Sequence, residues 1–378
     1  MAAIRIPVYR PAVGAREREL VLDCLDGGWI SSRGRHVAEF ERQFAARTQA
    51  GHATAVCNGT VALHLAMLAL GIGPGDEVIV PTLTYVASAN AIRYVGATPV
   101  FADADPATWQ IDPDDVARRI TGRTRAILAV HLYGQACDMQ RLVAIADRSG
   151  SLLIEDCAEA FGTLVRGRHV GTFGQVGTYS FYGNKTITTG EGGMVVTGDP
   201  ALHDRMVRLK GQGLAAGREY WHDIVGYNYR MTNLCAAIGL AQLEQADHFL
   251  TRKRAIARRY AEGLGGTGLV MQAEDDASLH SWWMCSVLVP EAAARDPLRA
   301  HLAAAGIETR PLFAPVHAMP MYRRSGERFP VAEDLSARGV NLPSWPGLTD
   351  GEIDEVIERC AGFAAGWREP AGRLAPAV

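Results

Sequence analysis

The stretch Leu152-Leu153-Ile154-Glu155-Asp156-Cys157-Ala158-Glu159 is an apolar run that passes directly into two adjacent carboxylates, with a third carboxylate three residues later. Buried strands of parallel sheets have such continuous apolar runs. In an open α/β sheet, ligands bind beyond the carboxyl ends of the strands. The stretch therefore predicts a buried strand that ends at a functional site, although an Asp at a strand end also caps turns.

Short apolar runs alternate with helical patterns from Gly51 to about Val196, and turn residues separate them. This alternation is typical of βαβ units and of a mainly parallel sheet. The pattern predicts a helix buried on all sides at Val61–Leu70 and an amphipathic helix at Asp138–Arg148. The predicted strands are Glu77–Pro81, Pro99–Ala102, Ala126–His131, Leu152–Glu155, Thr178–Tyr182 and Gly193–Thr197.

The C-terminal part of the chain follows a different pattern. The segment Thr232–Arg259 is rich in Ala, Leu, Gln and Glu and predicts one long helix that leaves the first domain. We expect a large domain at residues 1–250 and a smaller α+β domain at residues 251–378. The segments predicted in the smaller domain are a strand at Trp282–Val289, a helix at Pro297–Ala305 and a loop-rich stretch at Arg310–Pro346.

The composition argues against several classes of protein. A count of 38 Lys and Arg against 41 Asp and Glu gives a formal net charge of -3, which offers no basic surface for nucleic acid or for an anionic membrane. No apolar run approaches the ~20 residues that span a bilayer, and the first ten residues lack a signal-peptide pattern, so we expect a cytoplasmic protein. The seven cysteines form no CxxC pair, which predicts free thiols and no metal site.

Two further stretches lie where a strand passes into a helix or turn. Asn58-Gly59-Thr60 precedes the buried helix and offers N–H groups to a phosphate, although Asn and Thr are also ordinary N-cap residues. Ser180-Phe181-Tyr182-Gly183-Asn184-Lys185 leads into a glycine-rich turn. Most loop lysines are simply exposed, but Lys185 follows Asp156 by one strand-loop unit. This placement predicts that both side chains face one pocket, where Asp156 suits a cationic ring nitrogen.

Together with Gly75-Asp76-Glu77-Val78-Ile79-Val80-Pro81-Thr82, Tyr85 and Gly226-Tyr227-Asn228-Tyr229-Arg230-Met231, these stretches resemble the DegT/DnrJ/EryC1/StrS sugar aminotransferases over nearly the whole chain. The resemblance implies fold type I of the pyridoxal-phosphate (PLP) enzymes, as in aspartate aminotransferase, with a mainly parallel seven-stranded sheet in the large domain. It also implies PLP as the cofactor and a homodimer whose active sites lie at the subunit interface. The implied reaction transfers an amino group from L-glutamate to a keto sugar nucleotide.

The resemblance assigns roles to individual residues. Lys185 holds the cofactor and moves protons, Asp156 meets the pyridine nitrogen, and Tyr85 stacks over the ring. Glu159 stands where the family usually has Gln beside the ring hydroxyl. A carboxylate there must share a proton with the phenolate or repel it. The residues expected at the phosphate are Gly59, Thr60, Ser180 and, from a neighbouring subunit, Asn228.

Several stretches are most similar to the branch of the family that aminates C4 of GDP-4-keto-6-deoxy-mannose. The stretches are Trp29-Ile30-Ser31-Ser32, Pro81–Ala91, His131–Gly134, Phe181–Val196, Lys210–Leu214 and Gly226–Gln245. The residues expected at the substrate are Trp29, Ser31, Arg310 and His317. A UDP- or dTDP-linked keto sugar remains an alternative acceptor.

Two other activities stay open within the family. PLP-dependent sugar dehydratases resemble these proteins but have His in place of the lysine, so Lys185 argues against that reaction. A PLP-binding regulator without turnover would have degraded substrate loops, whereas the loops at residues 29–32 and 310–322 are intact.

Overall fold

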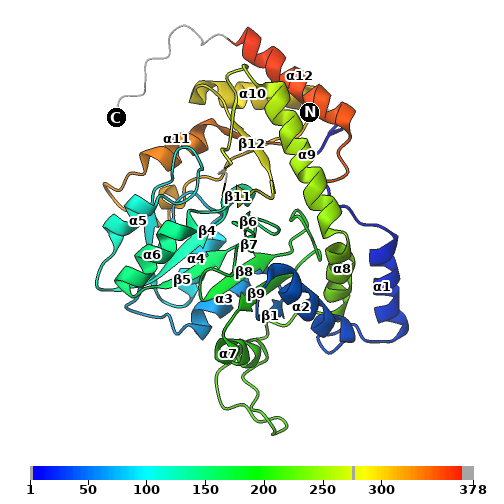
Figure 1. Cartoon of the computed structure of the whole chain (residues 1–378), viewed down its shortest axis with the longest axis vertical. Helices are drawn as coiled ribbons and strands as arrows, with labels where there is room; N and C mark the ends of the chain where they lie inside the picture. The colour runs from blue at the N-terminus through cyan, green and yellow to red at the C-terminus, as the bar shows by residue number, and fades with distance from the viewer. Residues whose placement is uncertain (1–2, 275–276, 368–378) are drawn as a thin grey trace.

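The central feature of the protein, a computed structural model that describes residues 3–274 and 277–367, is a seven-stranded sheet (Figure 1). β9 pairs antiparallel with both of its neighbours, β1 and β8, and the other pairings of the sheet are parallel. This arrangement confirms the predicted α/β fold with a mainly parallel sheet. In spatial order the strands are β1 (His52–Val56), β9 (Gly193–Thr197), β8 (Val176–Ser180), β5 (Leu152–Asp156), β4 (Thr124–Val130), β2 (Glu77–Pro81) and β3 (Thr98–Ala102).

Each of the six predicted strands coincides with a strand of this sheet. β2 and β9 have the predicted bounds, and the bounds of the other four agree within two residues. β1 is not among the predicted strands, because its sequence His-Ala-Thr-Ala-Val contains two alanines, a residue type that favours strands poorly.

Helices cover both faces of the sheet because successive side chains of a strand point to opposite sides. Along β4, Leu128 belongs to the apolar cluster beneath α3 and α4, whereas Ile127 and Ala129 belong to the cluster beneath α5 and α6. α3 is buried along nearly its whole length, as predicted, and the chain turns away from it at Gly71, where φ is +70°. The α-helices within residues 3–210 are α1 (Ala15–Asp26), α2 (Arg35–Thr48), α3 (Gly59–Ala69), α4 (Ala87–Tyr94), α5 (Pro113–Arg119), α6 (Met139–Ser149) and α7 (Pro200–Lys210).

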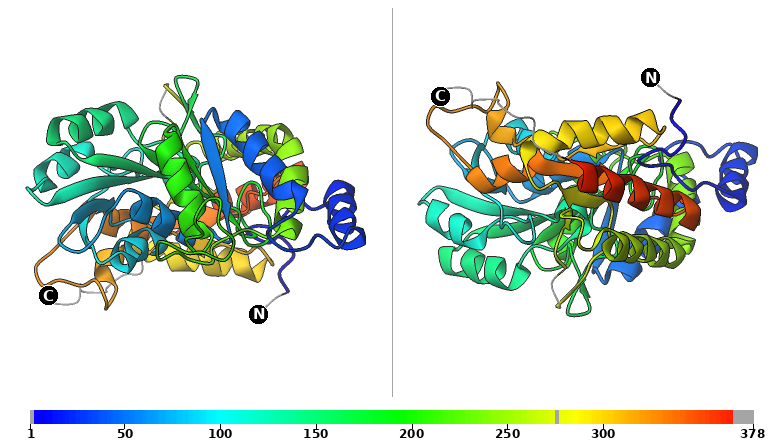
Figure 2. Two further views of the ribbon diagram at one scale, coloured as in Figure 1. Left: turned by 90° about the horizontal axis from the view of Figure 1, so that it is seen from below. Right: turned by 90° about the horizontal axis from the view of Figure 1, so that it is seen from above.

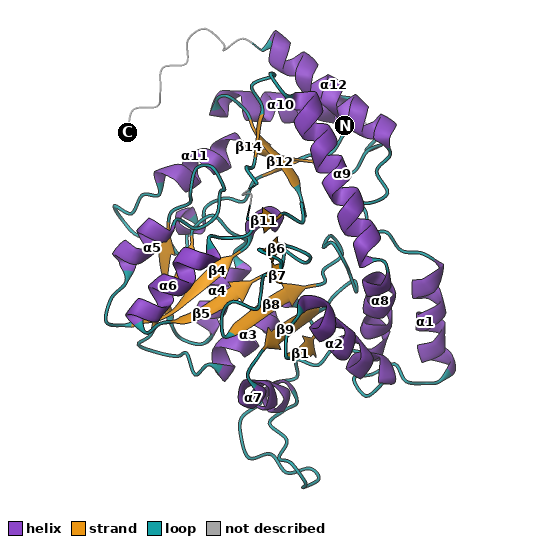
Figure 3. Ribbon diagram, viewed as in Figure 1, coloured by secondary structure: helices purple, strands orange, loops and turns teal. Residues whose placement is uncertain are grey.

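The single helix predicted at Thr232–Arg259 is wrong, because the chain forms two helices there. α8 (Asn233–Glu244) and α9 (Ala246–Leu264) are separated at Gln245, which has φ -100° and ψ 1°. The Gln245 side chain donates a hydrogen bond to Glu17 of α1 (3.1 Å). The break lets α8 pack against α1 and α2 while α9 runs on to pack against α12 (Figure 3).

The C-terminal part contains a second, four-stranded antiparallel sheet, separate from the large one in Figure 3. Its strands in order are β10 (Val270–Met271), β12 (Cys285–Leu288), β14 (Gly339–Leu342) and β13 (Arg310–Pro311), and its helices are α10 (Ala292–Ala304), α11 (Pro330–Arg338) and α12 (Asp350–Gly366). A third small sheet consists of β11 (Ser278–Leu279), β6 (Leu164–Val165) and β7 (Arg168–His169). β12 and α10 correspond to the predicted strand and helix, but the stretch predicted as loop-rich also contains α11 and β14.

The boundary predicted at residue 250 falls within α9, which links the two parts of the chain. Residues 368–378 of the predicted small domain lie outside the described residues, and the division into two domains stays a prediction. α1 stands at the outer edge of the molecule in both views of Figure 2. Among the helices of the described ranges, none has an apolar stretch long enough to cross a membrane.

Candidate active site

A cavity of about 580 Å³ lies at the carboxyl ends of the strands of the large sheet. Asp156 ends β5 and Ser180 ends β8, and these two strands pair in parallel, so the loops that follow them open on the same edge. This geometry brings together most of the residues predicted to bind the cofactor. Those that line the cavity are Gly59, Thr60, Tyr85, Asp156, Glu159, Ser180 and Lys185.

Asp156 is a buried carboxylate with a fixed orientation. Its Oδ2 accepts a hydrogen bond from the Ser88 hydroxyl (2.8 Å), and its Oδ1 accepts one from the backbone N–H of Ala158 (3.1 Å). Burial raises the pKa of this carboxyl above its ordinary value, and the two hydrogen bonds oppose the rise. A cation placed in the cavity would stabilise the ionised form.

Lys185 and Glu159 face each other across the cavity, with Nζ 3.8 Å from Oε1. The other Glu159 oxygen accepts a hydrogen bond from the backbone N–H of Tyr133 (2.8 Å). Burial raises the pKa of Glu159 to about 7. Burial also lowers the pKa of Lys185, against the charges of Glu159 and Asp156. The lysine is therefore easier to deprotonate than an exposed one, as a proton-transferring amine requires.

The N-terminus of α3 forms one wall of the cavity. Its N-cap Asn58 accepts from the backbone N–H of Val61 (3.0 Å), while Gly59 and Thr60 occupy the first turn, where backbone N–H groups have no partner within the helix. A Cβ atom on Gly59 would lie 2.7 Å from Cβ of Ser180 and 3.0 Å from its hydroxyl. Only glycine lets this helix end approach Ser180 so closely, and the resulting cluster of donors suits a phosphate.

Two aromatic residues that hydrogen-bond to the backbone at Asn184 and Lys185 were not predicted from the sequence. Tyr9, in the N-terminal arm, donates a hydrogen bond from its hydroxyl to the carbonyl of Lys185 (2.6 Å). Trp283, just before β12, donates from its indole N–H to the carbonyl of Asn184 (2.7 Å). Both come from segments far from Lys185 in sequence, and each looks like an ordinary core residue, so no local signal points to them.

Five of the predicted site residues do not line this cavity: His317, Arg310, Asn228, Trp29 and Ser31. His317 is buried, and its ring nitrogens face the Thr82 hydroxyl (2.7 Å) and the Glu333 carboxylate (3.3 Å). Arg310, in β13, is exposed and pairs with its neighbour Glu308 (2.6 Å). Asn228 lies between α7 and α8, at the base of the segment that projects from the body in Figure 1, where it bridges Gly211.

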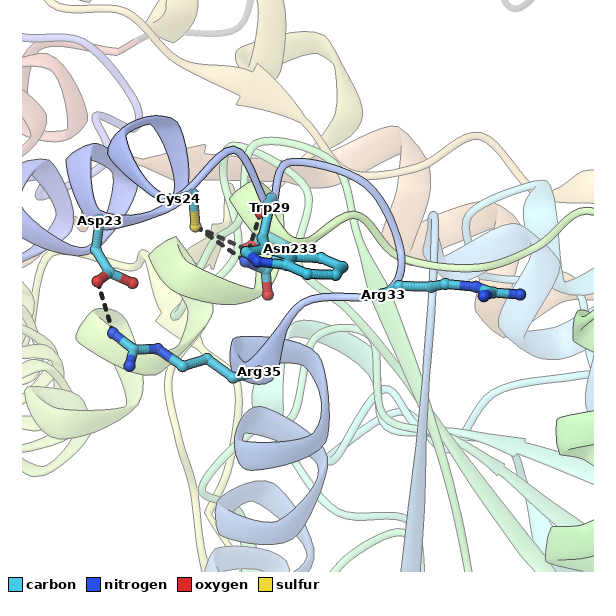
Figure 4. Close-up of a pocket in the computed structure, with 7 residues that line it drawn as sticks. Asp23, Cys24, Trp29, Arg33, Arg35 and Asn233 are labelled. Carbon is cyan, nitrogen blue, oxygen red and sulfur yellow. Dashed lines mark hydrogen bonds and ion pairs between the residues drawn. The ribbon is translucent and has the colours of Figure 1, made fainter.

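Trp29 and Ser31 belong to a loop that α8 holds in place. The Asn233 side chain donates to the Trp29 carbonyl (2.7 Å) and accepts from the backbone N–H of His36 (2.9 Å). The backbone N–H of Asn233 donates to the Ser31 carbonyl (2.8 Å). Trp29 and Asn233 line a smaller cavity of about 320 Å³, separate from the one that contains Lys185 (Figure 4).

His131, Glu155 and Cys157 form a buried group of potential metal ligands beneath the cavity. The Glu155 carboxylate already accepts hydrogen bonds from the backbone N–H groups of residues 171, 173 and 174, and it lies 3.2 Å from the His131 ring. The other ring nitrogen of His131 accepts from the backbone N–H of Cys137 (3.1 Å). These contacts tie β5 to the loop before β8, so the group is explained as a structural network.

A sequence model of the DegT/DnrJ/EryC1/StrS aminotransferase family matches residues 11–361. The chain belongs to this family. It is 56% identical to GDP-perosamine synthase of Escherichia coli O157:H7, over 95% of this chain and 98% of that protein. It is 52% identical to GDP-perosamine synthase of Vibrio cholerae, over 93% of this chain and 97% of that protein.

Solved structures of aminotransferases confirm the fold class. The aminotransferase TlmJ from Streptoalloteichus hindustanus superposes with a TM-score of 0.91 at 34% identity, covering 95% of this chain and 99% of that one. A putative sugar aminotransferase from Streptococcus pneumoniae, in its PLP-form, superposes with a TM-score of 0.91 at 29% identity, covering 95% and 98%. The family assignment makes the chain a PLP-dependent sugar aminotransferase, as the sequence predicted.

The residues that line the cavity fit PLP in their chemistry. The helix end at Gly59 and Thr60, closed by Ser180, suits the phosphate at one side. The buried Asp156 suits a protonated ring nitrogen, and the Lys185 amine lies in the same cavity. These three features match the three groups by which a PLP enzyme holds its cofactor.

Proposed function

We propose that this enzyme transfers the amino group of L-glutamate to C4 of GDP-4-keto-6-deoxy-D-mannose and forms GDP-perosamine and 2-oxoglutarate. The observation that carries the proposal is the shared cavity of Lys185 and Asp156 in a chain that is 56% identical, over 95% of its length, to a GDP-perosamine synthase. The identity extends over nearly the whole of both chains, and its length and level support the choice of acceptor.

Each residue of the cavity has a part in the proposed reaction. Bound PLP supplies an electron sink for the reacting carbon. Lys185 Nζ takes the proton from that carbon and returns it on the other side of the transfer, a role typically worth about 10² to 10⁴-fold. Asp156 would hold the ring nitrogen in its charged form, and Tyr85 would cover one face of the ring. Glu159, whose Oε1 lies 3.8 Å from Nζ, would be beside the ring hydroxyl and would take up or release a proton as the charge of Lys185 changes.

The proposal includes a homodimer with shared active sites. Among the described residues that line the cavity, Lys185 is the only one with a cationic side chain. The substrates carry a diphosphate and two carboxylates, which need further donors. The segment between α7 and α8 projects from the body and carries the exposed residues Tyr220 (93%) and Val225 (86%) (Figure 1). Asn228 is exposed at the base of this segment, where it bridges Gly211. Burial of the segment against a second copy would bring Asn228 to the phosphate in the cavity of that copy.

The proposal also places the enzyme in the cytoplasm. All seven cysteines are free thiols, and most are buried. Reducing compartments keep thiols in this state.

The acceptor is tested by incubating the purified enzyme with L-glutamate and, separately, GDP-, UDP- and dTDP-linked 4-keto-6-deoxy sugars. Mass spectrometry should detect the 4-amino product from the GDP sugar, with one 2-oxoglutarate for each product. Preferred use of another nucleotide would refute the proposed acceptor. Sugar deoxygenation, or no 2-oxoglutarate with any acceptor, would refute transamination.

A further inference from the structure

The Lys185 amine has an aromatic neighbour that the proposed reaction does not use. Nζ lies 3.9 Å from the centroid of the Trp283 ring. The Glu159 carboxylate also lies close to this amine, at 3.8 Å. The face of an indole ring is electron-rich and attracts a cation at the distance of the Trp283 ring. Nζ therefore contacts both a carboxylate and a ring face, and both favour its protonated form.

Trp283 also holds the peptide that precedes Lys185. Its indole N–H donates to the Asn184 carbonyl (2.7 Å), and its side chain is buried. The one side chain thus restrains both ends of Lys185, the backbone through its edge and the amine through its face. A tryptophan that only filled the core would need neither contact.

We propose that Trp283 is a positioning residue that holds the free Lys185 amine where it transfers protons. The inference rests on the proposed function, in which Lys185 is the acid and base. The ring face stabilises the Lys185 amine while the amine carries the substrate proton. The indole N–H holds the Asn184 carbonyl and thereby the backbone from which the Lys185 side chain extends.

The segment after β4 fixes Trp283 itself. Tyr133 stacks on the Trp283 ring with an angle of 8° between the ring planes, and its backbone N–H holds Glu159. Tyr133 has φ +59° and Gly134 has φ +103°, and a Cβ on Gly134 would lie 2.8 Å from the backbone nitrogen of Trp283. This segment therefore contacts both the Trp283 ring and the Glu159 carboxylate, the two groups near Nζ.

The charged groups around Nζ come from few elements. Asp156 ends β5, and Glu159 follows it in the loop. Glu191 also lines the cavity, from the turn before β9. Trp283 contributes the aromatic face. A change at Trp283 removes none of the three carboxylates, so a shift in the pKa of Lys185 that Trp283→Leu shows and Trp283→Phe does not show reports on the ring.

The test measures the pKa of the Lys185 amine directly. L-glutamate converts the holoenzyme to the form with an aminated cofactor, in which Lys185 is not covalently bound. Labelling with acetic anhydride over a pH series, followed by peptide mass spectrometry, gives the labelling rate of Lys185 against pH. We expect Trp283→Leu to lower the apparent pKa by about one unit, a tenfold change in the protonation equilibrium. Trp283→Phe, which keeps a ring face, should stay close to the wild type.

Two further results complete the test. Phe313→Leu removes a ring that stacks on Tyr133 on the same side of the cavity, and it should leave the pKa of Lys185 unchanged. Trp283→Leu should lower kcat about tenfold or more while KM changes little, because the substrate is bound but the proton is transferred by a misplaced amine.

A labelling profile of Trp283→Leu that matches the wild type would overturn the inference. If Trp283→Leu does not fold, Trp283→Phe provides the test. Because this variant keeps a ring face, a fall in the apparent pKa of its Lys185 amine would show that the ring face has no role. If L-glutamate leaves the visible spectrum of the wild type unchanged, the proposed function fails. The same labelling of the enzyme after removal of the cofactor then tests Trp283 separately.

Discussion

Nζ of Lys185 lies 3.8 Å from Oε1 of Glu159, and burial shifts the pKa values of the two groups toward each other. The pKa of Glu159 rises to about 7, and the pKa of Lys185 falls below its ordinary value. The two shifts reduce the free-energy cost of passing one proton from Lys185 to Glu159. A proton-transferring lysine needs such a partner to reset its charge between the two halves of a transamination.

Replacing Lys185 with Ala should abolish amino transfer, since no other described amine lines the cavity. The fold should persist, because the side chain packs at the cavity surface. Steady-state assays of 2-oxoglutarate and circular dichroism would measure the two effects. Full activity of the variant would remove the central assignment.

Asp156→Asn should weaken cofactor binding and turnover by about 10²-fold or more. At an effective dielectric near 20, an opposite charge ~4 Å away contributes ~4 kcal/mol before desolvation is subtracted. Ser88→Ala is the matched control, because it removes the hydrogen bond to Asp156 (2.8 Å), worth ~1 kcal/mol, together with the contact of the same hydroxyl with Thr84, and it leaves the charge of Asp156 in place. Equal losses in both variants would show that the charge of Asp156 is unimportant.

The stability of the cofactor-free protein should depend on the ionisation of Glu159. Its pKa is about 7 in the folded chain and 4.5 as the ordinary value, so the folded state binds more protons between these values. The free energy of unfolding should therefore fall as pH rises through this window, by at most ~3 kcal/mol. Urea unfolding at several pH values would measure the slope, and Glu159→Gln should flatten it. An equally steep slope in that variant would contradict the assignment.

Gly59→Ala should lower the affinity for the cofactor about tenfold, because the new Cβ would lie 2.7 Å from Cβ of Ser180 and force the helix end away. Gly122→Ala is a suitable control, since a Cβ there has no atom within 4 Å. Titration of the visible absorbance gives both dissociation constants. Unaltered binding by Gly59→Ala would argue against a phosphate at this helix end.

Mixing Lys185→Ala with Asn228→Ala protein should restore part of the activity that each variant lacks. If each cavity takes Lys185 from one subunit and Asn228 from the other, a heterodimer has one cavity with both residues intact. Subunit exchange is verified by native mass spectrometry of differently tagged chains. Exchange without any recovery would count against shared sites.

The convergence of Asp156 and Lys185 could be predicted because it depends on local patterns. Asp156 ends an apolar run, and Lys185 follows the next strand of the predicted sheet. Residues at the carboxyl ends of neighbouring parallel strands lie at one edge of the sheet, and β5 and β8 do pair in parallel. The break at Gln245 could not be predicted in this way, because a side-chain contact with Glu17, more than two hundred residues earlier, accompanies it.

The roles of Trp283 and Tyr133 could not be predicted from the sequence either. Trp283 lies in a run predicted as an ordinary strand, and its role depends on a neighbour about a hundred residues away. The contribution of Tyr133 comes from its backbone N–H and a positive φ, which residue type does not reveal. His317 stays a prediction as a substrate contact, and its ring faces Thr82 and Glu333.

Asn233 allows only glycine at position 34, since a Cβ on Gly34 would lie 1.8 Å from its side chain. Hydrogen bonds from Asn233 to the Trp29 and Ser31 carbonyls also hold this loop, which presents the indole of Trp29, a residue that is 60% exposed. A molecule or subunit that covers this indole loses little conformational entropy in ordering the loop. Its affinity then depends mainly on the area it buries.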